Sequence, residues 1–128
     1  MKKFLAIGIF LSILLLGCAT TYHKVSFTGG YDDFPLGAGK YEITAKGNGY
    51  TPENQVRDIA FHRAAELTLS MGKAYFYILD NQNNKEQSLS IVNHNISTVT
   101  KHEFTMIIMP TDNTDGVNAK ETLALYTK

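Results

Sequence analysis

The stretch Thr51–Gly72, TPENQVRDIAFHRAAELTLSMG, predicts one long helix around which the rest of the fold is built. Thr51 is a good N-cap, Pro52 suits the first helical position, and Glu53 is favourable near the positive end of the helix dipole. Gly72 is placed to end the helix, because glycine readily adopts the left-handed conformation of a C-terminal cap. We expect a helix of about twenty residues, a common length in globular domains.

One side of this helix is apolar. At about 100° per residue, a single stripe carries Val56, Ile59, Ala60, Ala64, Leu67 and Met71. Asp58, His62 and Glu66 fall away from that stripe, which predicts that the helix packs on a sheet. Arg63 lies at the border of the stripe, where a charge is costly unless it is paired or its head group reaches water.

A strand is predicted on each side of the helix. In residues 40–46, KYEITAK, Tyr41, Ile43 and Ala45 alternate with polar residues, which is typical of a half-buried strand. The following GNGY suggests a tight turn in which residues 47–49 tolerate positive φ. Residues 73–80, KAYFYILD, are apolar on both faces and favour a central strand.

The remaining segments complete the predicted sheet. GGYDDFPLGAG, residues 29–39, is rich in Gly and Pro and is interpreted as a loop, and NQNNKEQ, residues 81–87, as a solvated loop. The predicted strands are 25–27, 88–99 with a bend or hairpin turn at 93–95, 104–109 ended by Pro110, and 122–127.

Together these elements predict an α+β domain. Its two layers are one main helix and a mostly antiparallel sheet of about four or five strands, formed by residues 25–128 as a single domain. The sheet has a second face, to which we assign Tyr75, Tyr77, Met106 and Met109. If nothing covers that face, it marks an interaction surface.

The N-terminal region has the layout of a secretory signal. Lys2 and Lys3 precede an uncharged apolar run over residues 4–16, and Cys18 follows directly. As a helix the run reaches about 20 Å, short of the ~30 Å hydrocarbon core that a spanning helix crosses. Cys18 is the single cysteine, so it has no intrachain disulfide partner, and only His23 lies near enough in sequence for a shared metal site. Lipidation, an ordinary cleaved signal and an uncleaved anchor remain open.

Leu15-Leu16-Gly17-Cys18 resembles the bacterial lipobox. The resemblance implies a signal peptide over residues 1–17 and a Cys18 that carries diacylglycerol and usually a further acyl chain such as palmitate. Leu16 departs modestly from the pattern, where a small residue is commoner. Ala19 rather than Asp after the cysteine implies export to the periplasmic face of the outer membrane, with residues 18–24 as an acylated tether.

A second resemblance spans about fifty residues, from Gly29 to Leu79. GGYDD, GKYEITAKGNGYT, HRAAELTL and AYFYIL, in that order, resemble a family of small bacterial lipoproteins of unassigned function. Residues 81–128 match less well. The resemblance supports a lipoprotein and this fold, and it implies no activity, substrate or catalytic residue.

The charge balance argues against nucleic-acid binding. The chain has 12 basic and 12 acidic residues, and Lys2 and Lys3 belong to the predicted leader. The remainder carries a net charge of about −2, whereas nucleic-acid binders are strongly basic.

No pattern of residues indicates catalysis. His62 and Glu66 have the i, i+4 spacing of two metal ligands but are too few, and His94 and His102 lack an acidic cluster nearby. Asp112, Asp115 and Gly116 lack the spacing of a calcium loop and are better explained as a turn. We therefore expect no metal, no cofactor and no enzymatic activity.

Arg63 and Glu66 are the candidate partner-binding residues. They could form an i, i+3 ion pair, or Arg63 could present its guanidinium to a carboxylate or phosphate of a partner. We expect a lipoprotein that binds or assembles an envelope protein without catalysis. The alternative is a small-ligand-binding or hydrolytic lipoprotein that uses Arg63 or a histidine.

Overall fold

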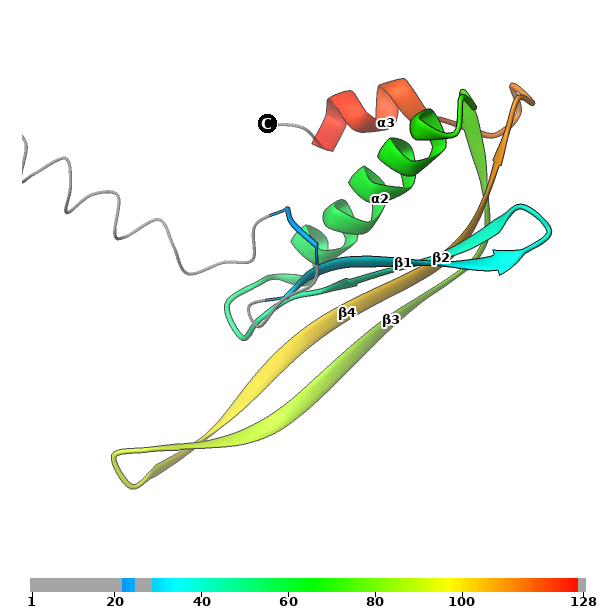
Figure 1. The fold of residues 1–128 in the computed structure, drawn as a ribbon. Helices are drawn as coiled ribbons and strands as arrows, with labels where there is room; N and C mark the ends of the chain where they lie inside the picture. Colours follow the sequence, from blue (N-terminus) through cyan, green and yellow to red (C-terminus); the bar gives the residue numbers. More distant parts are fainter. Residues whose placement is uncertain (1–21, 25–28, 127–128) are drawn as a thin grey trace, which may run out of the picture.

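The computed structural model describes residues 22–24 and 29–126, which form five strands and two helices (Figure 1). The elements in chain order are β1 (Gly30–Gly37), β2 (Lys40–Lys46), α2 (Glu53–Ser70), β3 (Tyr75–Val92), β4 (Asn95–Thr111), β5 (Val117–Asn118) and α3 (Ala119–Tyr126). The sheet order is β1-β2-β4-β3-β5, and all neighbours are antiparallel. The predicted two-layer α+β class is therefore confirmed. Among the residues described, no helix has the length and apolar character needed to cross a membrane.

Helix α2 lies across one face of the sheet and encloses the core (Figure 1). Because β4 pairs antiparallel with both β2 and β3, those two strands run parallel on either side of it. The predicted stripe of α2 is buried except for Met71. Its side chains contact those of the sheet in one cluster, whose largest buried members are Phe76, Ile43, Met106, Ile108 and Val56.

The C-terminal end of α2 follows the prediction, whereas its N-terminal end does not. Gly72 has a φ of 74°, and its N–H donates to the carbonyl of Leu69 while Lys73 N–H donates to that of Thr68. These are the two bonds of a Schellman cap. At the start, Pro52 is the N-cap, and the Thr51 hydroxyl donates to Asn48 Oδ1 (2.9 Å) instead of capping.

Two segments interpreted as loops are strands. Residues 30–37 form β1, in which Pro35 is tolerated because an edge strand leaves one row of N–H groups unpaired. Residues 81–87 continue β3, which reaches Val92. Their polar side chains indicated a loop, and in the structure all seven residues are exposed on β3.

The long β3–β4 hairpin extends well beyond the body of the sheet (Figure 1). Its turn is at Asn93 and His94, which have φ of 51° and 65°, so the predicted hairpin turn is confirmed. Strand β4 does not stop before Pro110, as predicted, but ends at Thr111. We call residues 85–102 the arm, because β2 pairs with β4 only as far as Lys46 and Glu103.

The predicted strand over residues 122–127 is wrong where the structure describes it, because residues 119–126 form α3, which packs against α2. Asn118 Oδ1 accepts the N–H of Glu121 (3.0 Å), and the Thr122 hydroxyl donates to the Asn118 carbonyl. Asn118 followed three residues later by Glu121 is a pattern typical of a helix N-terminus. The alternation of the residues that follow predicted a strand there instead.

Two predictions about the sheet faces and one about a turn also need correction. Met106 is fully buried on the helix side, where it pairs with Ile43, and does not lie on the second face. Residues 73–80 are not buried on both sides, since Leu79 is 46% exposed and β3 has beyond it only the two-residue β5. No positive φ occurs at residues 47–49, where Gly47 is required instead because a Cβ would lie 2.6 Å from Thr51 Cβ.

Candidate functional site

Arg63 is the centre of a charged cluster between α2 and β1. Its Nε donates to Asp33 Oδ2 (2.6 Å), and its NH1 donates to Glu66 Oε1 (2.5 Å). The guanidinium carbon also lies 4.9 Å from the ring centre of Tyr31, within the range of a cation–π contact. The predicted i, i+3 pair is present, and Asp33, which sequence spacing did not connect with it, is a second partner.

Tyr22 covers this cluster from the N-terminal segment. Its ring stacks on His62 with centroids 3.6 Å apart and an interplanar angle of 4°, and on Tyr31 at 4.8 Å. Its hydroxyl donates to Glu66 Oε2 (3.0 Å). The tether predicted over residues 18–24 is therefore wrong for residues 22–24, which are attached to the domain. Residues 18–21 and the predicted strand 25–27 lie outside the described residues.

The backbone also holds this segment. Tyr31 N–H donates to the carbonyl of His23 (2.8 Å), and Lys24 forms a parallel bridge with Tyr31. Gly30 has a φ of 120°, and a Cβ there would lie 2.4 Å from the His23 carbonyl oxygen. Glycine is therefore required at position 30 for both conformation and close approach.

The cluster changes the proton affinities of its members. Burial opposes the charge of Arg63, but its hydrogen bond and charge interaction with Asp33 raise its pKa above the usual value. Burial, followed by the hydrogen bond to Glu66, raises the pKa of Tyr22. Burial lowers the pKa of His62, and the nearby Glu66 charge opposes that shift. His62 is therefore mostly neutral at pH 7.

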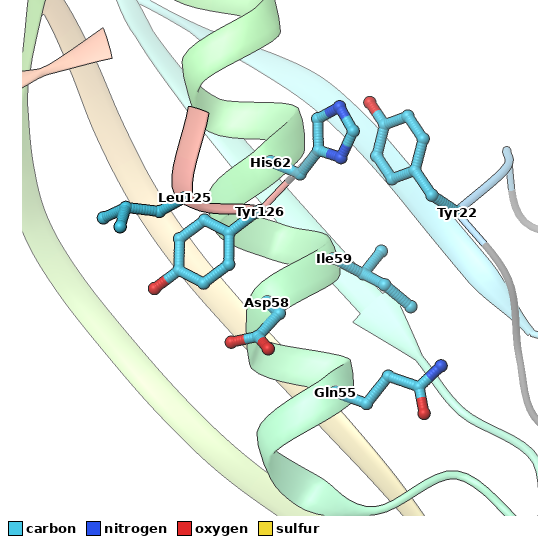
Figure 2. Close-up of a pocket in the computed structure, with 7 residues that line it drawn as sticks. All are labelled: Tyr22, Gln55, Asp58, Ile59, His62, Leu125 and Tyr126. Carbon is cyan, nitrogen blue, oxygen red and sulfur yellow. The ribbon is translucent and has the colours of Figure 1, made fainter. Parts of the chain in front are cut away.

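A pocket of about 530 Å³ lies beside the cluster, between α2, α3 and the N-terminal segment. Figure 2 shows the rings of Tyr22 and His62 on one side of it and Leu125 and Tyr126 of α3 on the other. Gln55, Asp58 and Ile59 of α2 complete the lining. A carboxylate and a neutral imidazole could bind a polar or cationic ligand here. The described lining contains no serine, threonine or cysteine that could act as a nucleophile.

The other predicted site residues are dispersed. His94 is at the arm's turn and His102 at its base, while His62 Nε2 lies 3.8 Å from Glu66 Oε2, as the i, i+4 spacing indicated. Asp112 pairs with Lys73, and Asp115 accepts the Tyr77 hydroxyl. In the part of the chain that the structure describes, no three potential metal ligands come together.

The arm forms a second candidate surface that the sequence did not reveal. Leu89, Ile91 and Ile96 are 76%, 72% and 71% exposed. Ile91 pairs with Ile96, and Leu89 lies two residues along the same strand, so all three share one face. At the base, residues 49–52, residues 98–100 and His102 line a concavity of about 660 Å³.

No protein-family model matches the sequence, and no curated protein or solved structure is significantly similar to it. The resemblance to a small lipoprotein family therefore stays a prediction.

Proposed function

We propose that this protein is a bacterial envelope lipoprotein, attached through lipidated Cys18 to the periplasmic face of the outer membrane. The signal-like residues 1–17 and the Leu15–Cys18 motif support the attachment. Each buried methylene of an acyl chain contributes ~0.8 kcal/mol, and two or three chains give lasting attachment. The domain would act without catalysis as a binding or assembly module.

The observation that carries the binding role is the apolar face of the arm. Leu89, Ile91 and Ile96 project from a hairpin that has no charged residue between Ser88 and Thr100. Full burial of an aliphatic side chain is worth about 1.5–3 kcal/mol, so these three could contribute strongly to an interface. Such a face is costly to keep in water and supports docking of an envelope protein.

The pocket beside Tyr22 supports the alternative role of small-ligand binding. Arg63 does not line this pocket, whereas His62 and Asp58 do, together with the polar groups of Tyr22, Gln55 and Tyr126. A hydrolytic role would rest on His62 and a bound water, with Asp58 as a second polar group. The arm and the pocket lie on different elements and can be tested separately.

Attachment is tested with a Cys18→Ser variant of the full chain. We expect the wild type to fractionate with membranes and to carry acyl mass on its N-terminal peptide, and the variant to lose both. A variant that stays with membranes and shows no change in acyl mass would refute the anchor.

Binding is tested by affinity purification of the intact acylated protein from envelopes. We expect a reproducible partner that is lost on Leu89→Ser/Ile91→Ser/Ile96→Ser substitution and retained on His62→Ala. The opposite result would favour the pocket as the functional site. Far-UV circular dichroism of both variants controls for folding.

A further inference from the structure

Strand β4 has an open edge along the arm. Strand β2 leaves β4 after the pair Lys46 and Glu103, and the ladder closes with the bond from Gly47 N–H to the His102 carbonyl (2.9 Å). The following Gly49 lies against the side chain of Val99. Beyond it, β4 pairs with β3 on one side as far as Asn95. No described strand pairs with its other side.

The hydrogen bonds of β4 to its neighbouring strands show which of its N–H and C=O groups point to the open edge. The N–H and C=O groups of successive residues in an antiparallel strand point to opposite sides. Because the His102 carbonyl points toward β2, the groups of Thr100, Thr98 and Ile96 point the same way, to the open edge. The register is regular from Lys85–His102 to Val92–Asn95, so the alternation is kept along the arm.

This edge lacks the features that usually prevent strand pairing. Residues 95–100, NISTVT, contain no charge and no proline, and four of the six are β-branched. The outer edge of β1, by contrast, has Pro35 and an irregular register beside it. The outer edge of β3 has an irregularity after Ile78 and the charges of Lys85 and Glu86. Farther along the arm, residues 87–92 of β3 are also uncharged and regular, but two of those six residues are β-branched, against four of six at positions 95–100 of β4.

We propose that the β4 edge of the arm pairs antiparallel with the same edge of a second copy of this chain, about a two-fold axis at Thr98. The two edges are identical, so each outward N–H meets a C=O, and no like charges are opposed. Thr98 faces its own counterpart, and Ile96 faces Thr100 of the second copy. A two-stranded ribbon is marginally stable alone, and the pairing converts two arms into a four-stranded sheet.

The concavity at the base of the arm agrees with this register. Pairing about Thr98 places His94, in the turn of one arm, opposite His102 at the base of the other. There, Tyr50, Pro52 and His102 line part of the 660 Å³ concavity, and Tyr50 is 76% exposed. A two-residue turn can enter this space, so each arm's turn would contact the other copy's base.

The stability of this dimer rests on the proposed membrane attachment, because the pairing of two strand edges buries only a small interface. Confinement of both copies to one membrane surface raises their effective concentration and favours weak contacts. We therefore expect the copies to pair in the envelope more readily than in dilute solution.

The test is disulfide trapping of the full chain in intact envelopes. A hydrogen-bonded antiparallel pair has Cα atoms about 5.5 Å apart, within the range of a disulfide. We expect Thr98→Cys to give at least tenfold more covalent dimer than Gln87→Cys, which lies on the outer β3 strand. Adding Thr100→Pro, which removes an N–H from the open edge, should abolish the dimer, whereas adding Gln87→Pro should leave it.

The remaining outcomes are distinguishable. No dimer from Thr98→Cys in envelopes that contain the acylated, folded protein would overturn the pairing. A crosslink to a protein of another mass would also overturn it and would assign the edge to an extended segment of a partner. Dimer formation by the wild type would show that the Cys18 sulfur is free, which would contradict the lipid anchor and not the pairing.

Discussion

Arg63 Nε lies 2.6 Å from Asp33 Oδ2, and this ion pair joins the middle of α2 to the edge strand β1. Both side chains are mostly buried, at 20% and 24% exposure, and Glu66 pairs with the same guanidinium. Tyr22 stacks above the cluster, so the ion pair also supports the site where the N-terminal segment joins the domain. Arg63 therefore contributes both to the stability of the domain and to the placement of the N-terminal segment that leads to the proposed anchor.

Arg63→Ala should lower the free energy of unfolding by about 1.5–3 kcal/mol, the usual contribution of hydrogen bonds to charged groups. The loss arises because Asp33 and Glu66 remain without the cation between them. Urea denaturation measures the effect, with Arg57→Ala on the exposed side of α2 as the control. Unchanged stability together with loss of an envelope partner would instead assign Arg63 to partner binding.

Stability should fall as the pH is lowered from 7.5 to 5.5, because burial lowers the pKa of His62 in the folded chain. The unfolded chain, with a His pKa of about 6.5, then binds more protons than the folded one, which favours unfolding. Above the unfolded-state pKa, His62 is neutral in both states and does not oppose folding. As the pH falls from that value toward the lower pKa of the folded chain, the free energy of unfolding decreases.

This pH effect is measured from urea midpoints at the two pH values. His62→Gln should reduce the difference between them, whereas His94→Gln, on the exposed turn of the arm, should leave it unchanged. Glu66 and Asp58 also lie near His62. Equal pH dependence in the wild type and in His62→Gln would contradict the assignment of the effect to His62.

The features predicted from sequence are those encoded by local patterns. The stripe of α2, the cap at Gly72 and the turn at Asn93 each depend on residues a few positions apart. Strand β1 was missed because its Gly and Pro residues indicated a loop, although an edge strand accepts them. Residues 81–87 of β3 were missed because an uninterrupted run of exposed polar residues has the composition of a loop.

The candidate site was harder to predict because it joins distant residues. Tyr22 and Glu66 are 44 positions apart, and Asp33 and Arg63 are 30 apart. The sequence showed that Arg63 needed a partner, and Glu66 was found from helical spacing. Neither Asp33 nor Tyr22 could be identified, since their positions depend on the pairing of β1 with β2 and on the bridge at Lys24.

Gly30→Ala should destabilise the protein more than Gly37→Ala. Both glycines have positive φ, 120° and 85°, so both substitutions carry a backbone penalty of order 1 kcal/mol. A Cβ at Gly30 also collides with the backbone of His23, whereas one at Gly37 meets nothing within 4 Å. Thermal melting compares the two variants, and equal losses would show that the contact between His23 and Gly30 is not maintained in solution.

Thr68→Val should stabilise the protein. Thr68 is fully buried in α2, and its Oγ1 has no described hydrogen-bond partner. An unpaired buried hydroxyl costs about 1–3 kcal/mol, and valine has nearly the same shape without the polar atom. We expect the free energy of unfolding to rise by about 1 kcal/mol, measured by urea denaturation.

Thr122→Val is the matched control for Thr68→Val. Thr122 is a second buried helical threonine, but its hydroxyl donates to the Asn118 carbonyl (2.7 Å). The same substitution there removes a hydrogen bond that supports the start of α3, so it should lower stability by about 1 kcal/mol. Both threonines are buried and both substitutions make the same change of shape. Stability changes of opposite sign would therefore come from the difference in hydrogen bonding. If Thr68→Val destabilised the protein as much as Thr122→Val, the Thr68 hydroxyl would have a partner in solution, such as a buried water.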